Sequence, residues 1–204
     1  MNGGTVLLWT AIAFLAGSLP FSVWLPRLVL RADVRRFGDG NPGSANAWKA
    51  GGWHVGLPAL LLDYLKGAVP VGLAHYVVGL TGWMLVPVAL APVVGHAFSP
   101  FLRFRGGKAL AVTFGVWTGL ILGAGPLILG LFFALFYLVQ SNDGWAALLG
   151  MVAFAGFLLV QGAGLPPLVA WGGNTLVLVW KHRRELRQPM RPRSWVGRLV
   201  DRLR

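Results

Sequence analysis

The basic residues of this 204-residue chain are confined to three short stretches, and long apolar runs separate them. Seventeen of the eighteen Lys and Arg residues lie between Arg27 and Lys49, between Arg103 and Lys108, or between Lys181 and Arg204. About 20 apolar residues are enough for one helix to cross a bilayer, so the runs predict a membrane protein. Because Lys and Arg collect in cytoplasmic loops, we assign all three stretches, and with them the net charge of +12, to the cytoplasmic side.

The length of each apolar run predicts how often the chain crosses the membrane. The runs 5–26, 53–78 and 83–101 each suit one helix. The runs 109–140 and 145–180 are too long, since the first would measure about 48 Å against a hydrocarbon core of about 30 Å. Glycine and proline at 123–126 and 162–167 should break them. We therefore expect an all-α, polytopic membrane protein with about seven transmembrane helices, its N-terminus outside and its C-terminus in the cytoplasm.

Two alternatives to this topology arise, one from the charge pattern and one from the first apolar run. The charges alone also accept five spans, because fusing each hairpin into one helix keeps every basic stretch on the same side. The first run could be mistaken for a cleaved signal peptide, but it lacks a charged start and contains Pro20 and Pro26.

With no cysteine in the chain, no disulfide framework or thiolate chemistry is expected.

The first basic stretch has the composition of a phosphate-binding loop. It contains three glycines, three small polar residues and a lysine: Gly38, Gly40, Gly43, Asn41, Ser44, Asn46 and Lys49. Glycines allow consecutive backbone N–H groups to turn toward one point, and the polar and charged side chains add hydrogen bonds to an anion. The alternative is a flexible loop whose arginines only set the topology.

The second basic stretch combines charge with a glycine pair before a predicted helix. Its candidate ligands are Arg103, Arg105, Gly106, Gly107 and Lys108. A helix start offers exposed N–H donors and the positive end of the helix dipole, which together suit an anion. The spacing is not that of a P-loop, and a simple stop-transfer cluster remains the alternative. His96 lies in the same loop and is expected to orient it.

Two charges lie inside a predicted span. Asp63 and Lys66 are three residues apart and so share a helix face. A charge in a span costs at least about 2.5 kcal/mol on insertion scales, so we expect either a functional role or an internal ion pair that locks helix packing. Of the four histidines, His182 at the start of the basic tail is the best-placed proton acceptor or phosphate ligand.

The remaining side chains do not suggest covalent or metal chemistry. No Ser-His-Asp arrangement stands out, and no histidine and carboxylate set has metal-ligand spacing. We therefore expect no metal and no cofactor. An enzyme of this composition would align two reactants, which should be anionic, with one of them lipid-like.

Five segments, in this order and spacing, resemble the bacterial acyl-phosphate:glycerol-3-phosphate acyltransferase family (PlsY): Gly17–Pro20, Gly38–Asn46, Leu62–Gly67, Gly95–Phe98 and Phe104–Lys108. The resemblance implies a seven-span inner-membrane enzyme with a cytoplasmic active site. Such an enzyme transfers a fatty acyl group from acyl phosphate to the sn-1 hydroxyl of glycerol 3-phosphate in phospholipid biosynthesis, giving lysophosphatidate and phosphate. It would need membrane lipid and its two substrates as partners, and neither nucleic acid nor an acyl-carrier protein.

The resemblance also assigns residue roles. Lys108 would bind phosphate, Ser141 would line the polar site, and Asn46 and His182 would match residues of the first motif and the tail. We expect residues 1–187 to form this acyltransferase-like domain. Residues 188–204 would form a basic tail, in which the apolar spacing after Ser194 predicts an amphipathic helix on the membrane surface.

Several positions depart from the family pattern. Asp39 stands where the first motif has serine, Ala109 where glycine usually follows the lysine, and Glu185 where an asparagine follows the tail histidine. A carboxylate beside a phosphate weakens anion binding unless it is paired with a cation. Asp39 could instead serve as the base. The departures keep open a catalytically weak relative with a different acceptor, and the intramembrane charges keep open a carrier for a phosphorylated metabolite.

Overall fold

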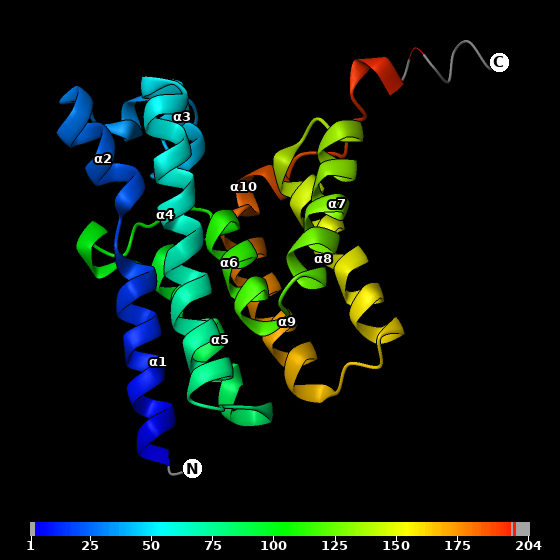
Figure 1. The fold of residues 1–204 in the computed structure, drawn as a ribbon. Coiled ribbons are helices and arrows are strands. Elements are labelled where there is room, and N and C mark those ends of the chain that lie inside the picture. Colours follow the sequence, from blue (N-terminus) through cyan, green and yellow to red (C-terminus); the bar gives the residue numbers. More distant parts are fainter. Residues whose placement is uncertain (1–2, 197, 199–204) are drawn as a thin grey trace. The chain divides into compact units, whose positions relative to one another are not determined.

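A computed structural model describes residues 3–196 and 198, and most of these residues lie in helices joined by loops (Figure 1). The α-helices, in chain order, are α1 Gly3–Ser18, α2 Phe21–Leu30, α3 Ser44–Gly51, α4 Trp53–Gly72, α5 Leu85–Ala97, α6 Leu110–Leu120, α7 Ala124–Val139, α8 Asp143–Val160, α9 Leu165–Lys181 and α10 Arg183–Leu186. Short turns of 3₁₀ or π type add Val34–Arg36, Leu73–Val77, Gly82–Met84 and Pro100–Leu102. Within the described ranges there is no β-strand, so the predicted all-α class is confirmed.

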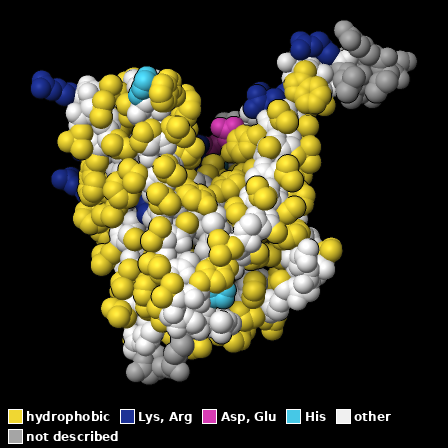
Figure 2. All heavy atoms as spheres, in the orientation of Figure 1, with side chains coloured by type: hydrophobic (Ala, Val, Ile, Leu, Met, Phe, Trp, Pro, Cys, Tyr) yellow, Lys and Arg dark blue, Asp and Glu magenta, His cyan; other side chains and the backbone are white. Residues whose placement is uncertain are grey.

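Among the described residues, four helical segments are long and apolar enough to cross a membrane: Gly3–Leu30, Trp53–Val77, Gly82–Leu102 and Asp143–Val160. Hydrophobic side chains make up most of the face shown in Figure 2, and exposed leucines such as Leu7, Leu28 and Leu131 are typical of surface that meets lipid. The helices α6 and α7 are apolar but shorter. At 1.5 Å per residue, α6 measures about 16 Å and cannot cross the hydrocarbon core alone. The count of seven spans and the orientation of the termini therefore remain predictions.

The helix breaks fall close to the expected residues, with one addition. The two long runs break between α6 and α7, where Gly123 has a left-handed φ of 78°, and between α8 and α9. The first run was expected to be a single helix, but α1 ends at Ser18 and α2 begins at Phe21. Pro20 precedes α2, and a proline has no N–H to continue the hydrogen-bond ladder of α1.

The chain divides into two compact units, residues 1–126 and 127–204, and the boundary falls in the first turn of α7. In the first unit, α4 packs on α6 and α1 packs on α5. Glycines allow the close approach: an added Cβ at Gly67 would lie 2.6 Å from the carbonyl oxygen of Val112, and one at Gly115 would lie 2.8 Å from the backbone nitrogen of Ala68. Small residues at helix contacts are the usual means of tight packing inside a membrane.

In the second unit, α8 packs against α9 and α10. The segment after α10 returns to the turn between α7 and α8, where Gln140 forms an isolated bridge with Pro192 and the Trp195 indole N–H donates to the Leu138 carbonyl at 3.0 Å. Part of the proposed tail is therefore tied to the second unit. The amphipathic helix predicted from Ser194 to Leu203 lies largely outside the described residues.

Candidate functional site

Asp39 joins the two basic loops of the first unit. The Lys108 ammonium lies 2.7 Å from Asp39 Oδ2. The other carboxylate oxygen, Oδ1, accepts the side-chain N–H of Asn46 at 2.7 Å and the backbone N–H of Asn41 at 3.1 Å. Three residues predicted for the site, separated by up to 69 positions, therefore meet at a single carboxylate: Asp39, Asn46 and Lys108.

The glycines of the first loop are needed for this geometry. Gly38 and Gly40 have left-handed φ values of 56° and 75°, which glycine adopts without strain. A Cβ at Gly38 would meet the Asn46 side-chain oxygen and lie 2.8 Å from the Lys49 ammonium. The loop therefore closes over α3, whose first residue is Ser44, and brings Lys49 to the same place.

The electrostatics keep Asp39 ionised. Burial raises the pKa of Asp39, but the hydrogen bond from Lys108 and those from Asn41 and Asn46 outweigh it, and together they lower the pKa from 3.8 to about 2. At neutral pH the pair is therefore a carboxylate and an ammonium. Because the Asp39 side chain is 47% exposed, water screens the pair and leaves it open to displacement by a stronger anion.

The second loop is held against the end of α5. The backbone N–H of Gly107 donates to the His96 carbonyl at 3.2 Å, and a Cβ at Gly107 would collide with the His96 ring. His96 thus contacts the glycine pair that precedes Lys108. Ala109, next to Lys108, has a left-handed φ of 63° and precedes the first residue of α6. Arg103 and Arg105 are exposed on the same loop.

A buried polar cluster lies beneath this loop. Asp63 and Lys66 are 1% and 3% exposed and their charged groups lie 2.6 Å apart. Lys66 also donates to the Leu19 carbonyl at 2.7 Å, and the Ser22 hydroxyl donates to Asp63. The Nδ1 atom of His96 lies 3.9 Å from Asp63. The pair therefore ties the break between α1 and α2 to α4 and lies close to His96 at the end of α5.

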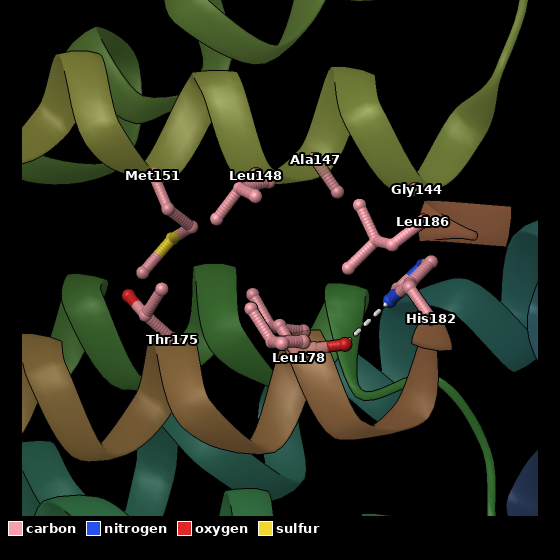
Figure 3. A pocket seen from close by; sticks show the side chains of 9 residues that line it. Gly144, Ala147, Leu148, Met151, Thr175, Leu178, His182 and Leu186 are labelled. Carbon is pink, nitrogen blue, oxygen red and sulfur yellow. Dashed lines mark hydrogen bonds between the residues drawn. The ribbon is translucent and has the colours of Figure 1, made fainter. Parts of the chain in front are cut away.

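The second unit holds the other predicted site residues. His182 is 1% exposed, and its Nδ1 atom is 2.9 Å from the Leu178 carbonyl oxygen. Figure 3 shows His182 at one end of a narrow, mostly apolar slot between α8 and α9, with Met151 and Thr175 at the other end. A side chain on Gly144 would lie 2.8 Å from Glu185 Cβ and 3.3 Å from His182 Cβ. Glycine at this position brings α8 close to α10.

Ser141 and Asn142 shape the start of α8. The Ser141 hydroxyl donates to the Arg191 carbonyl at 2.8 Å, so it is occupied by the tail segment. Asn142 was not predicted as a site residue. Its side-chain oxygen caps α8 by accepting from Gly144, and its amide donates to the Glu185 carbonyl at 2.8 Å. The sequence could have identified Asn142 by its position just before a helix, because asparagine is a preferred N-cap residue.

The predicted residues thus form two groups, one in each unit. The loops of the first unit gather Asp39, Gly40, Asn41, Gly43, Asn46, Lys49 and Lys108, and the second unit gathers Ser141, His182 and Glu185. Within the described residues, no cluster of three His, Asp or Glu side chains could hold a metal ion. The first group is suited to bind an anion, because it presents two lysines and an amide beside a glycine loop.

The sequence matches the family described as glycerol-3-phosphate acyltransferase over residues 7–191. It is 36% identical over 193 residues to glycerol-3-phosphate acyltransferase 1 of Thermotoga maritima, which covers 87% of this chain and 94% of the relative. It is 37% identical over 190 residues to a glycerol-3-phosphate acyltransferase of Rubrobacter xylanophilus, with 91% and 92% covered.

The fold is similar to the crystal structure of PlsY (YgiH), an integral membrane glycerol 3-phosphate acyltransferase, in its glycerol 3-phosphate form. The TM-score is 0.83 and the identity 28%, over 90% of this chain and 91% of that chain. The lysophosphatidic acid form of the same protein gives a TM-score of 0.79 at 26% identity. With four apolar helical segments of spanning length in its described part, the chain is a multi-pass membrane protein. The extent of these matches places it in the glycerol-3-phosphate acyltransferase family.

Proposed function

We propose that the protein transfers a fatty acyl group from acyl phosphate to the sn-1 hydroxyl of glycerol 3-phosphate. Its relatives are named as glycerol-3-phosphate acyltransferases, and the acyl phosphate donor rests on the resemblance of five sequence motifs. We place the reaction at the cytoplasmic face of the inner membrane, without an acyl-carrier protein. The observation that carries the proposal is the meeting of Lys108 and Asn46 at Asp39, which creates a cationic loop site for a phosphate.

The proposed chemistry needs no covalent enzyme intermediate. The sn-1 hydroxyl oxygen attacks the acyl carbonyl carbon, the bond from that carbon to the phosphate oxygen breaks, and phosphate leaves with the electron pair. The hydroxyl proton passes to a base. Because acyl phosphate is already an activated anhydride, the protein has to hold two phosphates in register, accept a proton and stabilise the developing negative charge.

The residues divide these tasks. Lys108 would bind a phosphate, with Asn46 and Lys49 as further ligands and the N–H groups of Gly106 and Gly107 beside it. His182 would accept the proton, and Ser141 and Glu185 would line the acceptor side. Acyl chains would lie between the membrane helices.

Asp39 is better suited to hold Lys108 than to act as the base. A general base works best when its pKa is near the working pH, and the pKa of Asp39 is lowered to about 2. We infer that Asp39 keeps the Lys108 ammonium in place until a substrate phosphate displaces the carboxylate. Asp39→Asn should then leave activity within about tenfold of the natural protein, whereas loss of a true base costs roughly 100-fold or more.

Phosphate release by the purified protein tests the reaction. Release should require both acyl phosphate and glycerol 3-phosphate, and Lys108→Ala should reduce it by roughly 100-fold or more, because a charge-stabilising contact is lost. Arg198→Ala removes an exposed positive charge from a residue with no role in the proposed reaction and should have no effect. Release at the same rate without glycerol 3-phosphate would contradict the proposal.

The carrier alternative depended on Asp63 and Lys66 lining a pathway. Both side chains are almost fully buried, and they are engaged by each other, by Ser22 and by the Leu19 carbonyl. This arrangement suits a packing role. Uptake of glycerol 3-phosphate into vesicles without formation of lysophosphatidate would favour the carrier over the acyltransferase.

A further inference from the structure

A second basic site lies beside the C-terminal end of α2. It is a hollow of about 680 Å³ lined by Arg27, Arg31, Ala32, Asp33, Arg36 and Phe37. Asp39 and Lys108 are not among its lining residues, so the hollow is distinct from the candidate acyl-transfer site. Three of its six lining residues carry a guanidinium group, whose planar fork matches the oxygens of a phosphate.

The one carboxylate of the hollow is already engaged. Asp33 lies 2.7 Å from a guanidinium nitrogen of Arg35 and 3.3 Å from one of Arg27. The hydrogen bond from Arg35 is the main cause that holds the pKa of Asp33 below its ordinary value, so this carboxylate remains ionised and paired. Arg35 is outside the hollow and supplies a charge that offsets Asp33.

The other two arginines of the hollow have different surroundings. The side chains of Arg31 and Arg36 are exposed, and they make no hydrogen bond or ion pair with any residue of the described ranges. Two guanidinium groups therefore face a hollow without a protein carboxylate of their own. Each can form a bidentate pair of hydrogen bonds with a phosphate.

An apolar surface adjoins these arginines. Leu28 lies three residues before Arg31 and Leu30 three residues after Arg27, so each shares a helix face with an arginine of the hollow. Their side chains are 79% and 38% exposed, and α2 belongs to an apolar segment long enough to cross a membrane. Exposed apolar side chains next to guanidinium groups are what an amphiphile needs, because its chains and its head group require different surroundings. A free phosphate ion would use only the arginines.

We propose that this hollow binds the phosphate head group of an anionic membrane lipid. Arg31 and Arg36 would hold the phosphate, Arg27 would add charge, and the acyl chains would run along Leu28 and Leu30. A basic pocket beside a membrane helix is a known form of lipid head-group recognition. The inference uses none of the residues assigned to acyl transfer, so it stands or falls separately from the proposed function.

Native mass spectrometry of the full chain in neutral detergent tests the site. The protein is titrated with phosphatidylglycerol or with phosphatidylcholine, in the absence of acyl phosphate and glycerol 3-phosphate. The natural protein should retain phosphatidylglycerol in preference to phosphatidylcholine. The double variant Arg31→Gln/Arg36→Gln should lower the retained phosphatidylglycerol at least about tenfold, because two charge-assisted contacts are lost.

A matched control separates a site from general charge. Arg184→Gln/Arg187→Gln also removes two exposed positive charges and should retain the lipid as the natural protein does. Equal losses in the two double variants would show that only net charge matters and would overturn the proposal. Complete displacement of the lipid by millimolar inorganic phosphate would also overturn it, since the hollow would then be a site for a soluble anion.

A conservative variant guards against misfolding. Arg36→Lys keeps the charge but loses the planar fork, and should bind phosphatidylglycerol with an intermediate loss. The elution profile and melting temperature of each variant should match those of the natural protein, since the side chains of Arg31 and Arg36 form no hydrogen bond or ion pair with any described residue. Retention by Arg36→Lys equal to that of the natural protein would remove Arg36 from the proposed bidentate contact and overturn the assignment.

Discussion

Asp39 shows how one carboxylate can be tolerated beside a phosphate site. It stands where the related family has serine, and repulsion of an anionic substrate was the expected penalty. The structure pairs it with Lys108 and Asn46, so the negative charge is matched before any substrate arrives. A substrate phosphate then competes with Asp39 for Lys108, which should raise the KM for that substrate more than it lowers kcat.

The pairing predicts a pH-dependent stability effect of Asp39→Asn. The pKa of Asp39 is lowered from 3.8 to about 2, so its ionised form stabilises the fold above pH 3.8, and this contribution is lost as the pH falls toward 2. At pH 7 the variant should melt slightly below the natural protein. Its free energy of unfolding should be lower by about 1 kcal/mol or less, because the pair is half exposed. The melting temperatures of the natural protein and of Asp39→Asn should converge as the pH is lowered from 7 to 2. A difference in melting temperature that stays constant with pH would contradict the pairing.

Asp63 and Lys66 predict strongly non-additive substitutions. Asp63→Asn alone leaves a buried ammonium without its counter-charge and should lower the free energy of unfolding by about 3 kcal/mol or more. Asp63→Asn/Lys66→Met removes both charges and should recover most of that loss. Thermal unfolding in detergent of Asp63→Asn, Lys66→Met and the double variant measures the interaction energy between the two side chains. A loss of stability in the double variant equal to the sum of the two single losses would show that the pair contributes no mutual stabilisation.

Ala109 predicts a stabilising substitution. It adopts a left-handed φ of 63°, which costs an L-residue about 1–2 kcal/mol, at a position where the related family has glycine. Ala109→Gly should therefore raise the melting temperature without removing a contact of Lys108. A lower melting temperature would show that the Ala109 methyl group, which is buried, contributes more by packing than its backbone costs.

At the scale of elements, the contact between α4 and α6 depends on glycine. Gly67 and Gly115 let the two backbones approach so closely that neither position has room for a methyl group. This packing fixes α6, whose N-terminal end follows Lys108, against the helix that carries Asp63 and Lys66. The contact between α4 and α6 therefore helps to hold the residues around Lys108 in place.

Gly115→Ala should destabilise the first unit, by about 1–3 kcal/mol, because overpacking forces α4 and α6 apart. Gly156→Ala is the matched control, since Gly156 also lies inside a helix but has nothing within 4 Å of an added Cβ. The control should be neutral or slightly stabilising, as alanine favours helix over glycine. Equal melting temperatures of the two variants would contradict close packing at Gly115.

At the scale of the molecule, the number of membrane crossings is the main open prediction. Seven spans place the turns near Leu122 and Ala163 outside the cell, whereas five spans bury both turns in the membrane. Because the chain has no cysteine, single cysteines can be introduced at these positions and at Arg187. A membrane-impermeant thiol reagent applied from outside should label Leu122→Cys and Ala163→Cys but not Arg187→Cys; protection of both turns would support five spans.

The sequence predicted the helical class and the positions of the main breaks, and it singled out most of the residues that the structure brings together in the two basic loops. Apolar runs, glycine and proline are local signals, so they could be read along the chain without knowledge of contacts. The break at Pro20 was missed because a proline near the middle of an apolar run is compatible with either a kink or an interruption. Membership in the acyltransferase family, which the ordered motifs indicated, is confirmed.

Other features depend on contacts between distant parts of the chain. The charge of Asp39 follows from the sequence, but its pairing with Lys108 required two loops to meet, and hydrogen bonds from Asn41 and Asn46 to hold the carboxylate. The hydrogen bonding of Lys66 likewise depends on the break after α1, because the break leaves the Leu19 carbonyl available to accept from its ammonium. Residue order thus determined where helices form and which groups are charged. Only the tertiary structure decided which charges neutralise one another, because Coulomb and hydrogen-bond energies depend on distances in space.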